Sequence, residues 1–222
     1  MQEAASIEAM HEAFGPDVPL RLDPNAIWSV ETSVAVGRRL EGRLEYLEDP
    51  TDGKANMAAV ARQVPMPLAT NMCTVAWSDI PETVERGSIH ILLSDHHHWG
   101  GLHATVKLAQ LCRVFGWGVS MHSNSHLGIS LMAMAHVAAA IPNLTYACDT
   151  HYPWQVEDVI AGGKRQFTDG ALVIDDTPGL GVELDEDALA RLHEQYQRAG
   201  LTRRDDVIEM QKVQPGWQPV RY

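Results

Sequence analysis

The sequence predicts an α/β fold, an incomplete (β/α)8 barrel of about six strand–helix units. Short apolar runs alternate with helical patterns along most of the 222-residue chain. A polar residue follows each apolar run, and successive polar residues are 25, 23, 24, 27 and 29 positions apart, which suits one strand, one helix and two loops. These residues are Asp23, Glu48, Asn71, Asp95, His122 and His151. Strands of such a barrel end at one face, so the six side chains are expected to converge on one active site.

The length agrees with one domain but not with a whole barrel. Eight strand–helix units typically need about 250 residues, and six parallel strands cannot close an eight-stranded barrel by themselves. The strand–helix units are expected over roughly 1–160, and a turn-rich return segment over 161–222. We therefore expect residues 1–222 to form one partial barrel domain that lacks two strands.

The strands are predicted from six apolar runs that are too short for helices and lie between turn residues or helical patterns. Each run leads into one of the six polar residues named above. The expected strands are 19–22, 44–47, 67–70, 89–94, 118–121 and 144–148.

Helical spacing of apolar residues fills the intervals between these runs. Ser29 is placed to cap one helix that runs to about Leu40, with Glu31 in the first turn near the positive end of the helix dipole. The stretch 127–140 is apolar almost all round, which predicts a helix buried on most faces. The expected helices are 3–14, 29–40, 55–64, 79–86, 102–115, 127–140 and 185–199.

Composition excludes several classes of protein. A net charge of −12 argues against nucleic acid as a partner, which needs a clustered basic face. The acidic N-terminus does not resemble a secretory signal, and no apolar run approaches the roughly 18 residues of a membrane span. The three cysteines, Cys73, Cys112 and Cys148, form no CxxC pair and fit reduced thiols. We expect a cytoplasmic enzyme with a small-molecule substrate and no membrane partner.

Three of the polar residues form an oxygen-rich set. Asp23, Glu48 and Asn71 follow three successive expected strands, and carboxylate and amide oxygens are the ligands of a hard cation such as Mg²⁺. Each one alone is also a common turn residue at a strand end. Three such residues in phase at one barrel face favour a metal site.

The next two polar residues have the types of a general base and its partner. A carboxylate at Asp95 would fix the tautomer of a neighbouring His122 and leave its second nitrogen to accept a proton. The alternative is a buried pair without catalytic role. Packing does not require the polar loop 123–126 that follows, so this loop favours a functional role for the pair.

Other motifs predict less. Consecutive side chains at His96–His98 diverge, and the chain has no CxxC or HExxH partner motif, so a zinc site there is disfavoured. Gly100-Gly101 lies at an expected helix N-terminus, where either an anion site or a plain turn explains it. The GxG within 178–181 does not follow a βαβ pattern, which argues against a nucleotide site.

Eight stretches together carry a resemblance to a known family. They are Leu22–Asn25, Glu48–Pro50, Ala69–Met72, Asp95 with His98-Trp99, His122–His126, Asp149–His151, Pro178–Glu183 and Arg204–Asp206. The combination covers essentially the whole chain and resembles the glucarate dehydratase group of the enolase superfamily, within its mandelate racemase-like branch. Asn71, at the third metal position, is the residue that points to this group.

The resemblance implies a hydro-lyase that acts on a six-carbon aldarate such as D-glucarate. It implies that Asp23, Glu48 and Asn71 bind Mg²⁺ and that His122 is a general base oriented by Asp95. The implied reaction removes the proton next to a carboxylate and then the β-hydroxyl as water, giving a keto-deoxy sugar acid. The implied substrate contacts are Asp23, Pro24, Asn25, Asn71, His122, Ser123, Asn124, His151 and Arg204.

Two features of that family are not found in this sequence. Its members carry an N-terminal capping domain and an early Lys-x-Lys motif that supplies a second base. None of the four lysines here has that spacing. We therefore expect the C-terminal portion of such an enzyme, acting as a homo-oligomer or with a chain that supplies the missing half. Two alternatives stay open, another acid-sugar dehydratase or epimerase, and a non-catalytic subunit that completes a partner's barrel.

Overall fold

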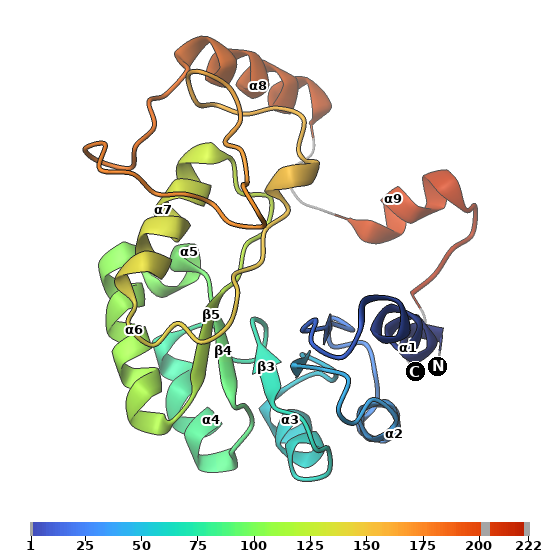
Figure 1. Cartoon of the computed structure of the whole chain (residues 1–222). Coiled ribbons are helices and arrows are strands. Elements are labelled where there is room, and N and C mark those ends of the chain that lie inside the picture. The colour runs from blue at the N-terminus through green and yellow to red at the C-terminus, as the bar shows by residue number, and fades with distance from the viewer. Residues whose placement is uncertain (1, 201–204, 220–222) are drawn as a thin grey trace. The chain divides into compact units, whose positions relative to one another are not determined.

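Five parallel strands in chain order form a single sheet (Figure 1). The structure is a computed structural model and describes residues 2–200 and 205–219. The strands are β1 (Arg21–Leu22), β2 (Tyr46–Glu48), β3 (Leu68–Thr70), β4 (Ile91–Ser94) and β5 (Gly118–Met121). The register pairs Glu48 with Ala69 and Ser94 with Met121, so the carboxyl ends of the strands lie along one edge. These findings confirm the predicted α/β class.

The prediction of a sixth strand at 144–148 is wrong. This segment makes one parallel bridge, Leu144 with Val119, and continues beside β5 through single hydrogen bonds. Side chains replace the regular ladder there. The Thr145 hydroxyl accepts the Val119 N–H at 3.3 Å, and the Ser120 hydroxyl donates to the Ala147 carbonyl at 2.8 Å.

Helices follow or precede each strand. Before and between the strands lie α1 (Gln2–Phe14), α2 (Val30–Arg39), α3 (Lys54–Ala61), the 3-10 turn η1 (Trp77–Asp79), α4 (Ile80–Arg86), α5 (His96–Trp99) and α6 (Leu102–Phe115). After β5 come α7 (Gly128–Ala140), the 3-10 turn η2 (Tyr152–Trp154), α8 (Glu186–Ala199) and α9 (Asp206–Val213). Among the described residues, no helix combines the length and the apolar character that crossing a membrane requires.

Local signals explain where these helices begin and end. The Ser29 side chain accepts the Thr32 N–H at 3.1 Å, which confirms the predicted cap of α2. Helix α6 ends at Gly116, whose φ of +70° is the left-handed conformation that glycine adopts without strain. The four-residue helix α5 was not predicted, because it is too short to show helical periodicity.

A cluster of buried apolar side chains from three neighbouring strands packs together. They are Tyr46, Ala69, Ile91 and Leu93, with Tyr146 packed against them. The Tyr46 and Tyr146 rings meet edge to face, 5.5 Å apart. Arg21 on β1 donates to the Ala147 carbonyl at 2.8 Å, although that residue lies beyond β5. The sheet is therefore curved, as in part of a barrel.

The chain divides into two compact units. The first comprises the described residues up to His122 together with Val137–Asp149, and it contains the whole sheet. The second comprises Ser123–His136 and the described residues from Thr150 onward. Within the second unit, an antiparallel bridge joins Ile160 to Leu184, directly before the Asp185 cap of α8.

Candidate active site

Five of the six predicted polar residues lie where the strands end. Asp23 follows β1, Glu48 is the last residue of β2, and Asn71 follows β3. Asp95 follows β4 and His122 follows β5. All five belong to the first compact unit, at the edge of the sheet where active sites of parallel barrels are built.

Oxygen atoms crowd around Glu48. The Asn71 side-chain amide donates to Glu48 Oε1 at 2.5 Å, and the Asn25 N–H donates to Asp23 Oδ1 at 2.8 Å. Burial, and then the charges of Asp23, Asp49 and Asp149, raise the pKa of Glu48 to about 9. Burial also raises the pKa of Asp23. Ionising this cluster without a counter-charge is therefore unfavourable.

This donor set fits a hard divalent cation. Buried carboxylates that raise one another's pKa are stabilised in their charged form by a cation among them, and oxygen donors are the ligands such cations take. Asp23, Glu48 and the amide oxygen of Asn71 supply such donors from three neighbouring strand ends. The site also has Asp149 close enough to act on Glu48 and on His122.

His122 faces the carboxylate of Asp95. Its Nδ1 lies 3.5 Å from Asp95 Oδ2, a charge contact that is too long for a good hydrogen bond. Burial alone lowers the pKa of His122, but the carboxylates of Asp95, Asp149 and Asp23 outweigh burial and raise it. Nε2 is the nitrogen that the Asp95 contact leaves available to accept a proton.

The second oxygen of Asp95 is held by α5. Asp95 Oδ1 accepts the His97 N–H at 2.9 Å and meets His97 Nδ1 at 2.8 Å. His96 is buried whereas the His97 side chain is 48% exposed, and the centroids of the two rings lie 4.0 Å apart. Gly100 and Gly101 both have positive φ and form the turn from α5 into α6.

The remaining predicted contacts fall in different parts of the chain. Pro24 and Asn25 lie in the loop after β1, where Asn25 has a φ of +54°. Ser123, Asn124 and His151 belong to the second compact unit. There the Ser123 hydroxyl donates to the Asn124 carbonyl at 3.1 Å. Arg204 lies outside the described residues.

The family follows from the sequence as a whole. The pattern of the family described as enolase C-terminal domain-like matches residues 1–188. The chain belongs to this enolase-related family. A relative named probable glucarate dehydratase, from Streptomyces coelicolor, is 52% identical over 218 residues, which are 97% of this chain and 50% of the relative.

Solved enolase-family structures agree with the fold. An enolase from Mycobacterium smegmatis complexed with formate and acetate has a TM-score of 0.92 and 60% identity, covering 98% of this chain and 51% of its own. An enolase from Thermobispora bispora complexed with magnesium and formate has a TM-score of 0.93 and 58% identity, covering 99% of this chain and 52% of its own. The chain thus spans about half the length of these members of the family.

Sequence reasoning gave no role to three polar residues that lie beside this candidate site. Asp149 directly follows the apolar run 144–148, and its N–H donates to the Met121 carbonyl at 3.1 Å, so the spacing argument could have chosen it before His151. Arg21 lies two positions before Asp23, and side chains two apart share a face of a strand. The third is Asp49, whose buried carboxylate receives the Asn71 N–H at 2.8 Å.

Proposed function

We propose that this chain supplies the metal site and one general base of a hydro-lyase for acid sugars, with D-glucarate as the substrate we favour. One observation carries the proposal. A crowded oxygen cluster at Asp23, Glu48 and Asn71 lies on the same strand-end edge as the pair His122–Asp95. The 52% identity to a probable glucarate dehydratase supports the choice of substrate.

The proton transfer follows from the residues of the chain. His122 Nε2 accepts the proton next to the substrate carboxylate, and the electron pair of that C–H bond stays with the substrate. Asp95 and Asp149 stabilise the imidazolium that forms, since their carboxylates already raise the pKa of His122 despite its burial. When bound, Mg²⁺ supplies positive charge beside the carboxylate and makes the neighbouring C–H bond more acidic.

Elimination then completes the reaction. The electron pair left at the α-carbon forms the new double bond, and the β-hydroxyl leaves as water with the proton that His122 carries. The unsaturated acid rearranges to a keto-deoxy sugar acid. The residues we propose to hold the aldarate are Pro24, Asn25, Asn71, Ser123, Asn124, His151 and Arg204.

We further propose that turnover requires the half of the relatives that this chain does not span. A general base contributes only about 10²–10⁴-fold, and the resemblance assigns a second base to that half. Lys54 does not replace it. Its ammonium pairs with Asp79 at 2.9 Å, and this hydrogen bond raises the pKa of Lys54 and keeps it protonated.

The test combines the purified chain with the N-terminal half of the Streptomyces coelicolor relative and measures keto acid formed from D-glucarate with Mg²⁺. We expect no turnover by either part alone, turnover by the mixture, and loss on adding EDTA. His122→Ala should remove most of this activity, at least about a hundredfold. His103→Ala, which changes an exposed histidine of α6, is the matched control.

Two results would contradict the proposal in different ways. Substantial turnover by the 222-residue chain alone would exclude the need for a second half. A mixture that acts on other aldarates or aldonates but not on D-glucarate would favour another acid-sugar dehydratase or epimerase, because metal and base serve any such proton abstraction.

A further inference from the structure

Asp49 has a backbone conformation that is uncommon for residues other than glycine. It follows the metal candidate Glu48, and its φ is +32°, in the left-handed region. Its side chain is almost fully buried, at 1% exposure. A strained backbone conformation persists only where several surrounding contacts hold it in place. Such residues are found often at functional sites.

The carboxylate of Asp49 uses both oxygens on the start of the loop after β3. Oδ1 accepts the Thr70 hydroxyl at 2.5 Å, and Oδ2 accepts the Asn71 N–H at 2.8 Å. Thr70, also buried, accepts the N–H groups of Met72 at 3.1 Å and Cys73 at 2.9 Å. Two buried side chains therefore hold three consecutive backbone N–H groups, beginning with that of Asn71.

The backbone of Asp49 forms hydrogen bonds with two neighbouring segments, strand β3 and the loop after β1. Its N–H donates to the Ala69 carbonyl of β3 at 3.0 Å. Its carbonyl accepts the Ala26 N–H at 2.7 Å, in the loop that begins with Asp23. One residue thus contacts the segments that carry Asp23 and Asn71, and is itself adjacent to Glu48.

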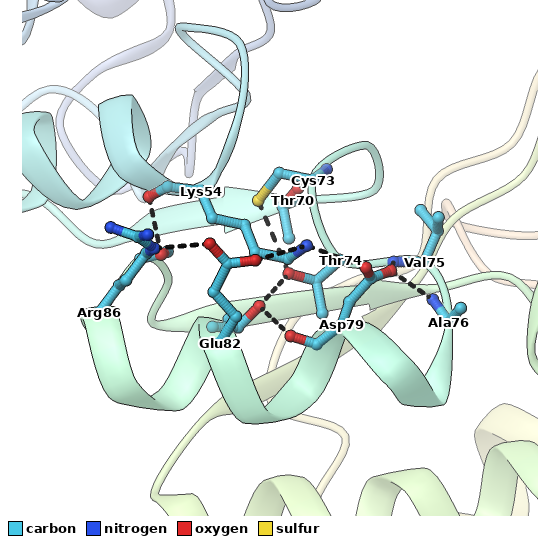
Figure 2. Close-up of polar contacts among 11 residues, drawn as sticks. Lys54, Thr70, Cys73, Thr74, Val75, Ala76, Asp79, Glu82 and Arg86 are labelled. Carbon is cyan, nitrogen blue, oxygen red and sulfur yellow. Dashed lines mark hydrogen bonds and ion pairs between the residues drawn. The ribbon is translucent and has the colours of Figure 1, made fainter.

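The far end of the loop after β3 has a separate anchor (Figure 2). Asp79 Oδ2 accepts the N–H groups of Val75 at 3.0 Å and Ala76 at 2.9 Å, and Oδ1 pairs with Lys54. Figure 2 also shows Thr70 and Cys73 at the near end of this loop. The loop is fixed at both ends, so a change at residue 49 acts on Asn71 without releasing Val75 and Ala76.

We propose that Asp49, with Thr70, is a positioning residue that sets the relative placement of Asp23, Glu48 and Asn71. This inference rests on the proposed function, which makes those three residues metal ligands. Asparagine cannot replace Asp49 fully. Two donors, the Thr70 hydroxyl and the Asn71 N–H, reach its two oxygens, and an amide offers one oxygen and one donor group instead.

The test measures Mn²⁺ binding to the full chain by electron paramagnetic resonance, and amide hydrogen exchange of the metal-free chain by NMR. Asp49→Asn should weaken Mn²⁺ binding about 10–100-fold, as changes to the partners of metal ligands do. It should also speed exchange at Asn71 at least about tenfold while β4 and β5 stay protected. Asp52→Asn, an exposed carboxylate of the same loop, is the matched control and should change neither.

Thr70 gives a second, independent pair of variants. Thr70→Val should speed exchange at Met72 and Cys73 and weaken Mn²⁺ binding, whereas Thr70→Ser keeps the hydroxyl and should restore both. Unchanged exchange at Asn71 in Asp49→Asn, or equal losses in Thr70→Val and Thr70→Ser, would overturn the inference. A wild-type chain that binds no Mn²⁺ would overturn the proposed metal site, and exchange at Asn71 would still decide whether Asp49 holds that residue.

Discussion

Glu48 is the residue at which burial and nearby negative charge together disfavour ionisation most strongly. It is 8% exposed, and burial together with Asp23, Asp49 and Asp149 raises its pKa to about 9. The metal-free protein must therefore either keep Glu48 protonated near neutral pH or accept an ion in an acidic, buried place. This cost is what the metal site that we propose would offset, since a bound cation reverses the sign of the local field.

A prediction follows for the pH dependence of stability without metal. The folded-state pKa of Glu48 lies above its ordinary value of 4.5, so the stabilisation from its protonation is complete below about pH 4.5 and is lost as the pH rises toward about 9. Glu48→Gln keeps an oxygen for the Asn71 amide and cannot ionise. We expect this variant to gain on the order of 1–3 kcal/mol at pH 8 in EDTA and much less at pH 5.

Thermal melting at the two pH values measures this gain. Glu41→Gln is a suitable control, because Glu41 is an exposed glutamate and the change removes a charge of the same kind. A Glu48→Gln gain of equal size at both pH values would contradict the assignment of the raised pKa to Glu48. With saturating Mg²⁺ the proposed metal site predicts that the order of stability inverts, since the variant would lose a charged ligand.

The sequence was sufficient to predict the positions of those residues that directly follow or end a strand. Asp23, Glu48, Asn71, Asp95 and His122 share that property, and strand ends can be read from apolar runs. Asp49 could not be found in this way. Its role depends on a left-handed backbone turn and on a hydroxyl from the neighbouring strand, and neither leaves a pattern in a single sequence.

Among the elements, the loop between β3 and α4 shows how a polar network replaces apolar packing. Lys54 at the start of α3 pairs with Asp79, and Asp79 also holds two backbone N–H groups (Figure 2). The Lys54 and Asp79 side chains are 17% and 24% exposed. Because both are largely shielded from water, this pair should contribute more than a surface ion pair.

We expect Lys54→Met to destabilise the chain by about 1–2 kcal/mol, since Asp79 loses a charged hydrogen-bond partner in a partly buried place. The melting temperature should fall by roughly 2–8 °C. Arg86→Met is the matched control. Its exposed pair with Glu82, four residues earlier in α4, should contribute no more than about 0.5 kcal/mol. Equal losses in the two variants would show that burial of the Lys54 pair adds nothing.

Strand prediction succeeded for β1 to β5, which are held by backbone hydrogen bonds to their neighbours. It failed at 144–148, because Thr145 and Ser120 use side-chain hydroxyls in place of ladder hydrogen bonds. Helix α5 was missed for a related reason. It depends on a local side-chain bond, in which Asp95 accepts the His97 N–H, and its four residues are too few to show helical periodicity. Local side-chain bonds of this kind compete with regular secondary structure and are hard to see in sequence.

At the scale of the whole molecule, the curved sheet of the first compact unit has two edges, one at β1 and one at the segment that follows β5. Five strands and the segment 144–149 occupy six of the eight places of a barrel. The fold class was predictable because six regular intervals suffice to recognise the barrel pattern. The side-chain contacts inside the curved sheet were not predictable, since the edge-to-face pair of Tyr46 and Tyr146 joins residues 100 positions apart in the sequence.

Arg21 makes the bond that joins the two sides of this sheet. Its Nη1 donates to the Ala147 carbonyl at 2.8 Å, its Nε pairs with Glu45 at 2.8 Å, and its guanidinium lies 4.7 Å from the centre of the Tyr46 ring. The side chain is 22% exposed, so these contacts are partly shielded from water. Arg21 thus connects β1 with the segment beyond β5, the two sides between which further strands would lie in a closed barrel.

We therefore expect Arg21→Met to destabilise the isolated chain by about 1–3 kcal/mol, the range for losing a charged hydrogen bond. The loss should be smaller once the N-terminal half of the Streptomyces coelicolor relative is supplied, because the added strands would hold β1 and 144–149 in place. Thermal melting of both preparations measures the difference, and Arg38→Met, an exposed arginine of α2, controls for loss of charge. An equal loss with and without the added half would contradict the view that Arg21 compensates for the open side of the sheet.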